Sequence, residues 1–106
     1  MTLVYSLAAA EDLESIYSYI LDQAGPAVAK KVLYAITGIC ERLKDYPNLG
    51  RRRPELDVLG FEARSIGEQG FLVVYTVHKA TVVVGRILHG SQDVGPHLVS
   101  GSDLTV

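Results

Sequence analysis

Residues 13–45 read LESIYSYILDQAGPAVAKKVLYAITGICERLKD, and this stretch decides the fold. Its first part places apolar residues at positions 13, 16, 17, 20, 21 and 24, which is the spacing of one face of an α-helix. Ser6 is expected to cap the start of that helix, because a serine oxygen can accept a hydrogen bond from a free amide of the first turn. Gly25 and Pro26 then end one helix and begin the next. Two helices joined by so short a link must fold back on each other, so the stretch predicts a helical hairpin.

The second helix is predicted to run from Pro26 to about Asp45. Its inward face is expected to hold Ala29, Val32, Leu33, Ile36, Ile39, Cys40 and Leu43. The segment from Tyr46 to Gly60 contains Pro47 and Gly50, and it is predicted to be a loop. The hairpin is therefore followed by a break before any further regular structure.

After residue 60 the apolar pattern changes from a helical to a strand period. Residues 61–66, 71–77 and 81–88 are rich in β-branched and aromatic residues and are separated by short turn-like links. These three segments are predicted to form an antiparallel meander, with the second and third in central positions. Residues 3–6 are predicted to be a further short strand. The expected fold is thus α+β in the order β-α-α-β-β-β, with the hairpin packed on a small antiparallel sheet.

Size and composition limit the classes of function. The chain has 106 residues, of which 48% are apolar and 21% charged, and its mean hydropathy is +0.20. One globular domain is expected over residues 1–93, with a tail at 94–106 that is flexible or ordered by a partner. Such a domain has little room for a cofactor cavity beside its core, so a large redox or nucleotide enzyme is excluded. The net charge of −2 also argues against direct, sequence-specific nucleic-acid binding.

Cysteine use and apolar runs indicate the compartment. Cys40 is the only cysteine, so no disulfide within the chain and no cysteine-based zinc site is expected. The first residues show no basic segment typical of a secretory signal. The longest apolar run, residues 71–77, is much shorter than the roughly 20 residues that span a bilayer. A cytoplasmic protein without membrane contact is therefore expected.

No cofactor or metal motif is present, so the candidate functional residues are single polar side chains. His78, His89 and His97 lack the spacing of paired metal ligands, and neither a metal nor a cofactor is expected. Arg64 and Arg86 lie in strands that flank the middle one and could share a sheet face, where each either pairs with a neighbour such as Glu62 or contacts an anion. His89, at the end of the last strand, is either a turn residue or a general base.

A second group of candidates suits contact with a partner. The stretch from Arg42 to Arg53 holds five cations against Asp45 alone. Within it, the arginines at positions 51, 52 and 53 stand between two prolines and are either a solvated loop or a site for a phosphate or an acidic partner. Tyr19 and Tyr34 fall off the apolar stripes and are expected on a partner surface, whereas Tyr17 and Tyr75 are expected in the core.

Several short pieces, taken in order, resemble the ParE branch of the RelE/ParE family, the toxin halves of bacterial type II toxin–antitoxin pairs. The pieces cover residues 3 to 93 and are Val4-Tyr5-Ser6, Ala10, Asp12-Leu13, Ile16, Tyr19-Ile20, Leu43, Pro47, Leu49-Gly50-Arg51, Pro54-Glu55-Leu56, Arg64, Tyr75 and Arg86-Ile87-Leu88-His89-Gly90-Ser91-Gln92-Asp93. The family has the same order of elements, a helical hairpin packed on an antiparallel sheet.

The resemblance implies one of two toxic activities. ParE-like members are described as inhibitors of DNA gyrase that block DNA replication, whereas RelE-like members cut messenger RNA in the ribosome. RNA cleavage would have to rely on His89, Arg64, Arg86 and Glu55, and the chain is poor in the lysines and lacks the late tyrosine typical of the nucleases. The ParE-like reading without catalysis is therefore favoured, and the endoribonuclease is the alternative.

The resemblance also implies partners. A ParD-like antitoxin is expected to neutralise the toxin by laying a helix or strand into the groove between the hairpin and the sheet. The residues at positions 51–53, 64, 86, 89, 19 and 34 are the candidates for binding the antitoxin or the target. A third possibility is a domain that has lost its toxicity and survives as a binding module for the antitoxin.

Overall fold

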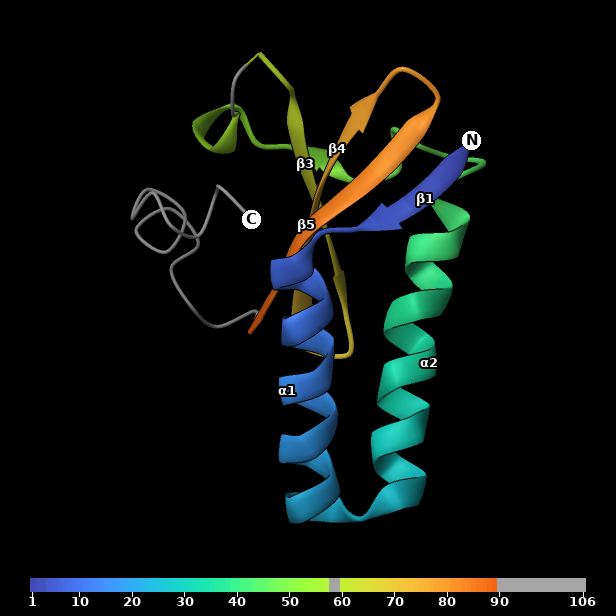
Figure 1. Ribbon diagram of the computed structural model, residues 1–106, viewed down its shortest axis with the longest axis vertical. Coiled ribbons are helices and arrows are strands. Elements are labelled where there is room, and N and C mark those ends of the chain that lie inside the picture. The colour runs from blue at the N-terminus through green and yellow to red at the C-terminus, as the bar shows by residue number, and fades with distance from the viewer. Residues whose placement is uncertain (58–59, 90–106) are drawn as a thin grey trace.

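The computed structural model describes residues 1–57 and 60–89, and its helices pack against one face of a sheet (Figure 1). The elements are β1 (Thr2–Tyr5), α1 (Leu7–Ala24), α2 (Pro26–Arg42), β2 (Arg51–Arg52), the 3₁₀ helix η1 (Pro54–Leu56), β3 (Ala63–Glu68), β4 (Phe71–His78) and β5 (Thr81–His89). The predicted α+β class and the order of its main elements are confirmed. The prediction for residues 94–106 lies outside the described residues.

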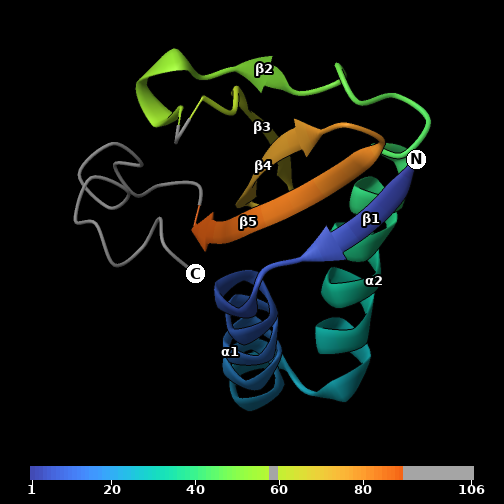
Figure 2. The same cartoon turned by 45° about the horizontal axis from the view of Figure 1, so that its top comes forward.

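The sheet agrees with the prediction in its central strands and differs from it in two respects. Its strand order is β1-β5-β4-β3-β2, so the expected central positions of β4 and β5 are confirmed (Figure 2). β1, however, pairs with β5 in parallel, which makes the sheet mixed. The loop after α2 also adds β2, a strand of two residues along β3 that no periodic pattern could indicate.

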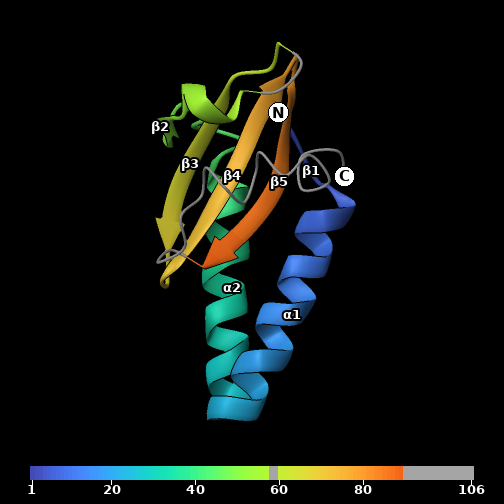
Figure 3. The ribbon, with the colours of Figure 1, turned by 90° about the vertical axis from the view of Figure 1, so that its left-hand side faces the viewer.

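The helical hairpin forms as its sequence predicts. Ser6 caps α1, and its Oγ accepts a hydrogen bond from the Ala9 amide at 3.0 Å. The same hydroxyl donates to the Gly85 carbonyl at 2.8 Å, so the cap also attaches α1 to β5. Gly25 ends α1 with φ +88, a backbone conformation that glycine adopts readily, and Pro26 begins α2. The tip of the hairpin projects beyond the sheet (Figure 3).

The main core lies between the helices and the sheet. Its buried members are Ala9, Ile36, Cys40, Leu43, Val73, Tyr75, Val82, Val84 and Ile87. Burial raises the pKa of the Cys40 thiol, which suits its predicted role as a packing residue. A smaller cluster of Leu56, Ala63, Val74 and Leu88 forms where η1 packs on the sheet. Tyr75 is buried as predicted, but Tyr17 is only half-buried.

Candidate functional site

A polar network attaches the loop after α2 to the sheet. The Tyr75 hydroxyl donates to the Pro47 carbonyl at 2.7 Å and accepts from the Gly50 amide at 2.8 Å. Arg64 Nη1 donates to the Gly50 carbonyl at 2.8 Å and to the Asn48 carbonyl at 3.4 Å. Neither sequence interpretation of Arg64 anticipated this arrangement. Its guanidinium holds the loop backbone, whereas Glu62 lies 3.8 Å from Arg52.

The three consecutive arginines differ in their contacts. Arg52 donates to both carboxylate oxygens of Asp57, at 3.0 and 3.1 Å, and to the Ala63 carbonyl at 2.7 Å. The hydrogen bond from Arg52, followed by that from the Ala63 amide, lowers the pKa of Asp57 below its ordinary value. Arg53 donates to Ser65 Oγ at 2.8 Å and to Glu55 at 3.4 Å. Arg51 is exposed, and within residues 1–57 and 60–89 no ion pair involves it.

Arg86 lies at the junction of β5 with α1. Its Nε and Nη2 donate to the two Asp12 carboxylate oxygens at 2.9 and 3.1 Å, and Asp12 also accepts from the Ile87 amide at 2.8 Å. Asp12 therefore joins the first turns of α1 to the part of β5 that extends past β1.

The strand register separates Arg64 from Arg86. Arg64 lies opposite Tyr75, and Arg86 lies opposite Val74. Because neighbouring residues of a strand point to opposite faces, the two arginines leave the sheet on opposite sides. The expectation that they share a face is wrong, because it took no account of which residues pair across the strands.

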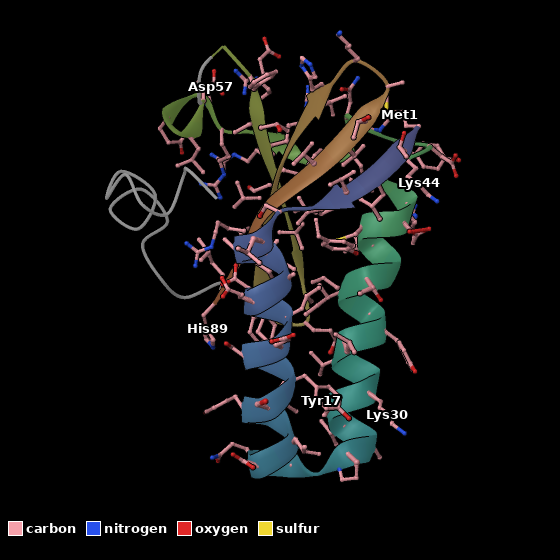
Figure 4. All side chains as sticks on the ribbon, in the orientation of Figure 1. Met1, Tyr17, Lys30, Lys44, Asp57 and His89 are labelled. Carbon is pink, nitrogen blue, oxygen red and sulfur yellow. The ribbon has the colours of Figure 1, made fainter. Side chains whose placement is uncertain are left out.

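The four residues proposed for RNA cleavage are also distributed over the molecule. His89 is exposed, packs edge-on against Phe71 with ring centroids 5.5 Å apart, and lies opposite that residue in the register. Arg64 lies opposite Tyr75, which is four residues after Phe71 on β4. At the usual rise of a strand, Phe71 and Tyr75 are about 13 Å apart along β4. Glu55 lies in η1 and contacts Arg53. Asp57, which follows η1, is well separated from His89 (Figure 4). The structure thus does not gather a base, an acid and two cations around one position.

The exposed aromatic residues lie mainly on the hairpin. Tyr19 on α1 is 63% exposed and Tyr34 on α2 is 67% exposed, as predicted for a partner surface. Tyr46, which follows α2, is 59% exposed and has the Arg42 guanidinium 6.0 Å from the centre of its ring. A groove of about 360 Å³ lies between the helices, where Tyr17 is seen (Figure 4). Its lining residues are Leu13, Glu14, Tyr17, Ser18 and Leu33, so it runs between α1 and α2 and not between hairpin and sheet.

Sequence reasoning missed two features. No contact was predicted for Asp12, although the residues at positions 9, 13 and 16 of the same helix face the core. An acid on an inward helix face and an arginine within a strand are complementary, and that pairing was the available signal. The contact of Gly50 with Tyr75 had no comparable signal, since it joins two residues 25 positions apart through a backbone amide.

No helix among residues 1–57 and 60–89 combines the length and apolarity needed to cross a membrane.

Comparisons with known proteins agree on one family. The family model described as "ParE toxin of type II toxin-antitoxin system, parDE" matches residues 3–94. Among solved structures, the chain is similar to one titled "Chromosomal ParDE TA system from P. aeruginosa", with a TM-score of 0.70 and 27% identity. That match covers 84% of this chain and 95% of the other. No curated protein sequence matches the chain.

Proposed function

The chain belongs to the ParE toxin family of type II toxin–antitoxin systems, and on that premise we propose that it inhibits DNA gyrase and so blocks DNA replication. A ParD-like antitoxin, made in the same cytoplasm, neutralises it by direct binding. The observation that carries the proposal is the family match over residues 3–94, which covers α1, α2 and every strand of the described sheet except Thr2 of β1.

The geometry supports an activity that acts through a surface. Cleavage of RNA requires a base, an acid and cations held around one phosphate. Here Arg64 binds loop carbonyls, Arg86 binds Asp12, and His89 stands about 13 Å from Arg64 along β4. The contacts of Arg64 and Arg86 stabilise the fold, and His89 lies apart from Arg64, so the RNA-cleaving alternative has less support than binding to gyrase.

The order in which macromolecular syntheses stop after induction tests the proposal. Cells that express the toxin from a repressed promoter are pulsed with labelled thymidine and labelled leucine at short intervals. A gyrase inhibitor stops thymidine incorporation first, while leucine incorporation continues until the secondary damage accumulates. Prior loss of leucine incorporation would instead indicate messenger RNA cleavage and would overturn the proposal.

Two controls complete this experiment. Co-expression of the antitoxin encoded beside the toxin gene is expected to restore growth and both incorporations. The variant His89→Ala is expected to remain as toxic as the unchanged protein, since His89 has no catalytic role in a gyrase inhibitor. Normal growth of cells that express the unchanged toxin alone would show a domain whose toxicity has been lost.

A further inference from the structure

The charges of this protein are unevenly distributed along the chain. Seven of its ten lysines and arginines lie within residues 30–53, together with only two of its twelve acidic residues. Helix α1 has the opposite character, with four acidic residues and no lysine or arginine. The two helices of the hairpin therefore present surfaces of opposite sign, although the net charge of the chain is only −2.

The outer face of α2 combines cations with exposed aromatic rings. Lys31, Tyr34, Gly38 and Arg42 follow the spacing i, i+3, i+7 and i+11, which places them on one side of the helix, and all four are exposed. This side is opposite the buried positions Ala29, Ile36 and Cys40. We call Lys31, Tyr34, Arg42 and the adjoining Tyr46 the α2 cationic face.

Among the residues that the structure describes, the cations of this face form no ion pair with a carboxylate. Lys44, Arg52, Arg53 and Arg86 each form an ion pair with an acidic residue. No such pair joins Lys30, Lys31 or Arg42 to an acid in the part of the chain that the structure describes. Lys30, which precedes Lys31 in the chain, projects from the side of α2 that is turned away from α1 (Figure 4). Lys31 and Arg42 are exposed on the side opposite the buried positions of α2, so their positive charge is accessible to whatever approaches α2 from outside.

The shape of the face suits a linear partner. From Lys31 to Arg42 the helix rises about 17 Å, which is the length of three turns. At Gly38, in the middle, an added Cβ would meet nothing within 4 Å, so the surface is open to the close approach of another chain. Tyr34 is 67% exposed, and tyrosine and arginine are among the residue types that contribute most binding energy in protein interfaces.

We propose that the α2 cationic face binds an acidic segment of the antitoxin, an inference that rests on the proposed function. Charge complementarity favours an acidic occupant, and the exposed tyrosines beside the cations favour a polypeptide. Free nucleic acid fits less well, since the protein as a whole is negatively charged and α1 carries its acids on the neighbouring helix. The antitoxin must hold the toxin firmly, and a face of this length offers several contacts in a row.

Calorimetric titration of the purified toxin with the antitoxin encoded beside its gene tests this assignment. The double variant Lys31→Gln/Arg42→Gln removes two cations from the face, and its dissociation constant is expected to rise about 10-fold or more in about 0.1 M salt. The matched control is Lys79→Glu, which changes the net charge by the same two units in the exposed turn between β4 and β5. It is expected to bind within about 2-fold of the unchanged protein.

Salt and a second variant separate electrostatic from apolar contributions. Affinity of the unchanged toxin is expected to fall as salt rises towards 1 M, where the Debye length is about 3 Å, and to fall less for the double variant. Tyr34→Ala is expected to weaken binding at every salt concentration, because it removes an aromatic contact. Unaltered affinity of both the double variant and Tyr34→Ala overturns the assignment, as does equal weakening by Lys79→Glu.

Further readouts distinguish this inference from the proposed function. The variants of the face are expected to stop thymidine incorporation as effectively as the unchanged toxin. Variants that bind the antitoxin normally but no longer stop thymidine incorporation would assign the face to the target or its DNA, and the inference would fail. A toxin whose self-association, measured by light scattering, is lost in the double variant would identify a second copy as the occupant. If the unchanged toxin binds the antitoxin through this face but leaves DNA synthesis intact, only the proposed target is wrong.

Discussion

Among the glycines that the structure describes, Gly50 is the one at which an added side chain would clash with its surroundings. A Cβ at this position would stand 2.7 Å from the Tyr75 ring and hydroxyl and 2.9 Å from the Ser65 carbonyl. Its amide and carbonyl are also bound by Tyr75 and Arg64. The loop that leads from α2 into β2 is therefore fixed at one glycine, and the arginines that follow are positioned by it.

Two alanine substitutions at glycines are expected to have opposite effects. Gly50→Ala should lower the free energy of unfolding by about 1–3 kcal/mol, because either the backbone or the buried Tyr75 ring must move. Gly38→Ala should raise it by about 0.5–1 kcal/mol, since α2 gains a better helix former in open space. Urea denaturation of both variants measures the difference, and changes of the same sign would contradict the described packing.

The Tyr75 hydroxyl is expected to contribute separately from its ring. Tyr75→Phe keeps the ring but leaves the Gly50 amide without its acceptor in a buried position, which should cost about 1–3 kcal/mol of unfolding free energy. Tyr34→Phe removes the same hydroxyl from an exposed ring and should change stability by less than about 0.5 kcal/mol. If thermal and urea denaturation do not distinguish the two variants, the hydroxyl does not hold the loop.

At the level of single residues, the sequence predicted burial better than contacts. The positions of Tyr19, Tyr34, Tyr75 and Cys40 follow from the helical or strand period and are confirmed. The role of Arg64 was not predictable, because its acceptors are backbone carbonyls in a loop with no periodic pattern. The spacing of apolar residues indicates which side of a helix or strand faces the core, but it does not indicate which polar group that side contacts.

Among the elements, the junction of α1 with β5 depends on Asp12. β1 pairs with β5 only as far as Val84, and beyond it the Ser6 hydroxyl and the Asp12 carboxylate occupy the edge of β5. The side chains of Asp12 and Arg86 are 16% and 17% exposed, so the pair is largely withdrawn from water. An unpaired strand edge at this point is thereby covered by a helix.

Removal of the Asp12 carboxylate is expected to lower the stability of the fold. Asp12→Ala leaves the Ile87 amide and the Arg86 guanidinium without their shared acceptor and should lower the free energy of unfolding by about 2–3 kcal/mol. Glu41→Ala breaks a solvent-exposed pair with Lys44 and should change it by less than about 0.5 kcal/mol. Hydrogen exchange of the Ile87 amide gives a local check, since it should accelerate in the first variant alone.

The elements themselves were largely predictable. The hairpin was predicted within a few residues, because a strong helical period, a serine cap and a glycine–proline link all indicated the same boundaries. β2 was missed because two residues carry no period, and the parallel direction of β1 was missed because it depends on how the hairpin returns the chain to the sheet.

Over the whole molecule, the hairpin separates the surface into two parts of opposite charge. α1 exposes Glu11, Glu14 and Asp22, whereas α2 exposes Lys30, Lys31 and Arg42. Of the three consecutive arginines that the sequence offered for contact, those at positions 52 and 53 are paired with acids of the same segment, whereas Arg51 is exposed. The exposed cations of α2 form a second cationic surface, and a small domain of this kind is suited to act through such surfaces.

Inhibition of DNA gyrase is measured most directly with purified components. DNA gyrase, relaxed plasmid and ATP are incubated with the toxin, and the plasmid is then analysed by gel electrophoresis with and without prior protein denaturation. Toxin at micromolar concentration is expected to inhibit supercoiling or to accumulate cleaved plasmid, and prior addition of the antitoxin is expected to prevent either effect. Unchanged supercoiling without cleaved DNA, in the presence of a folded toxin that binds its antitoxin, would show that gyrase is not the target.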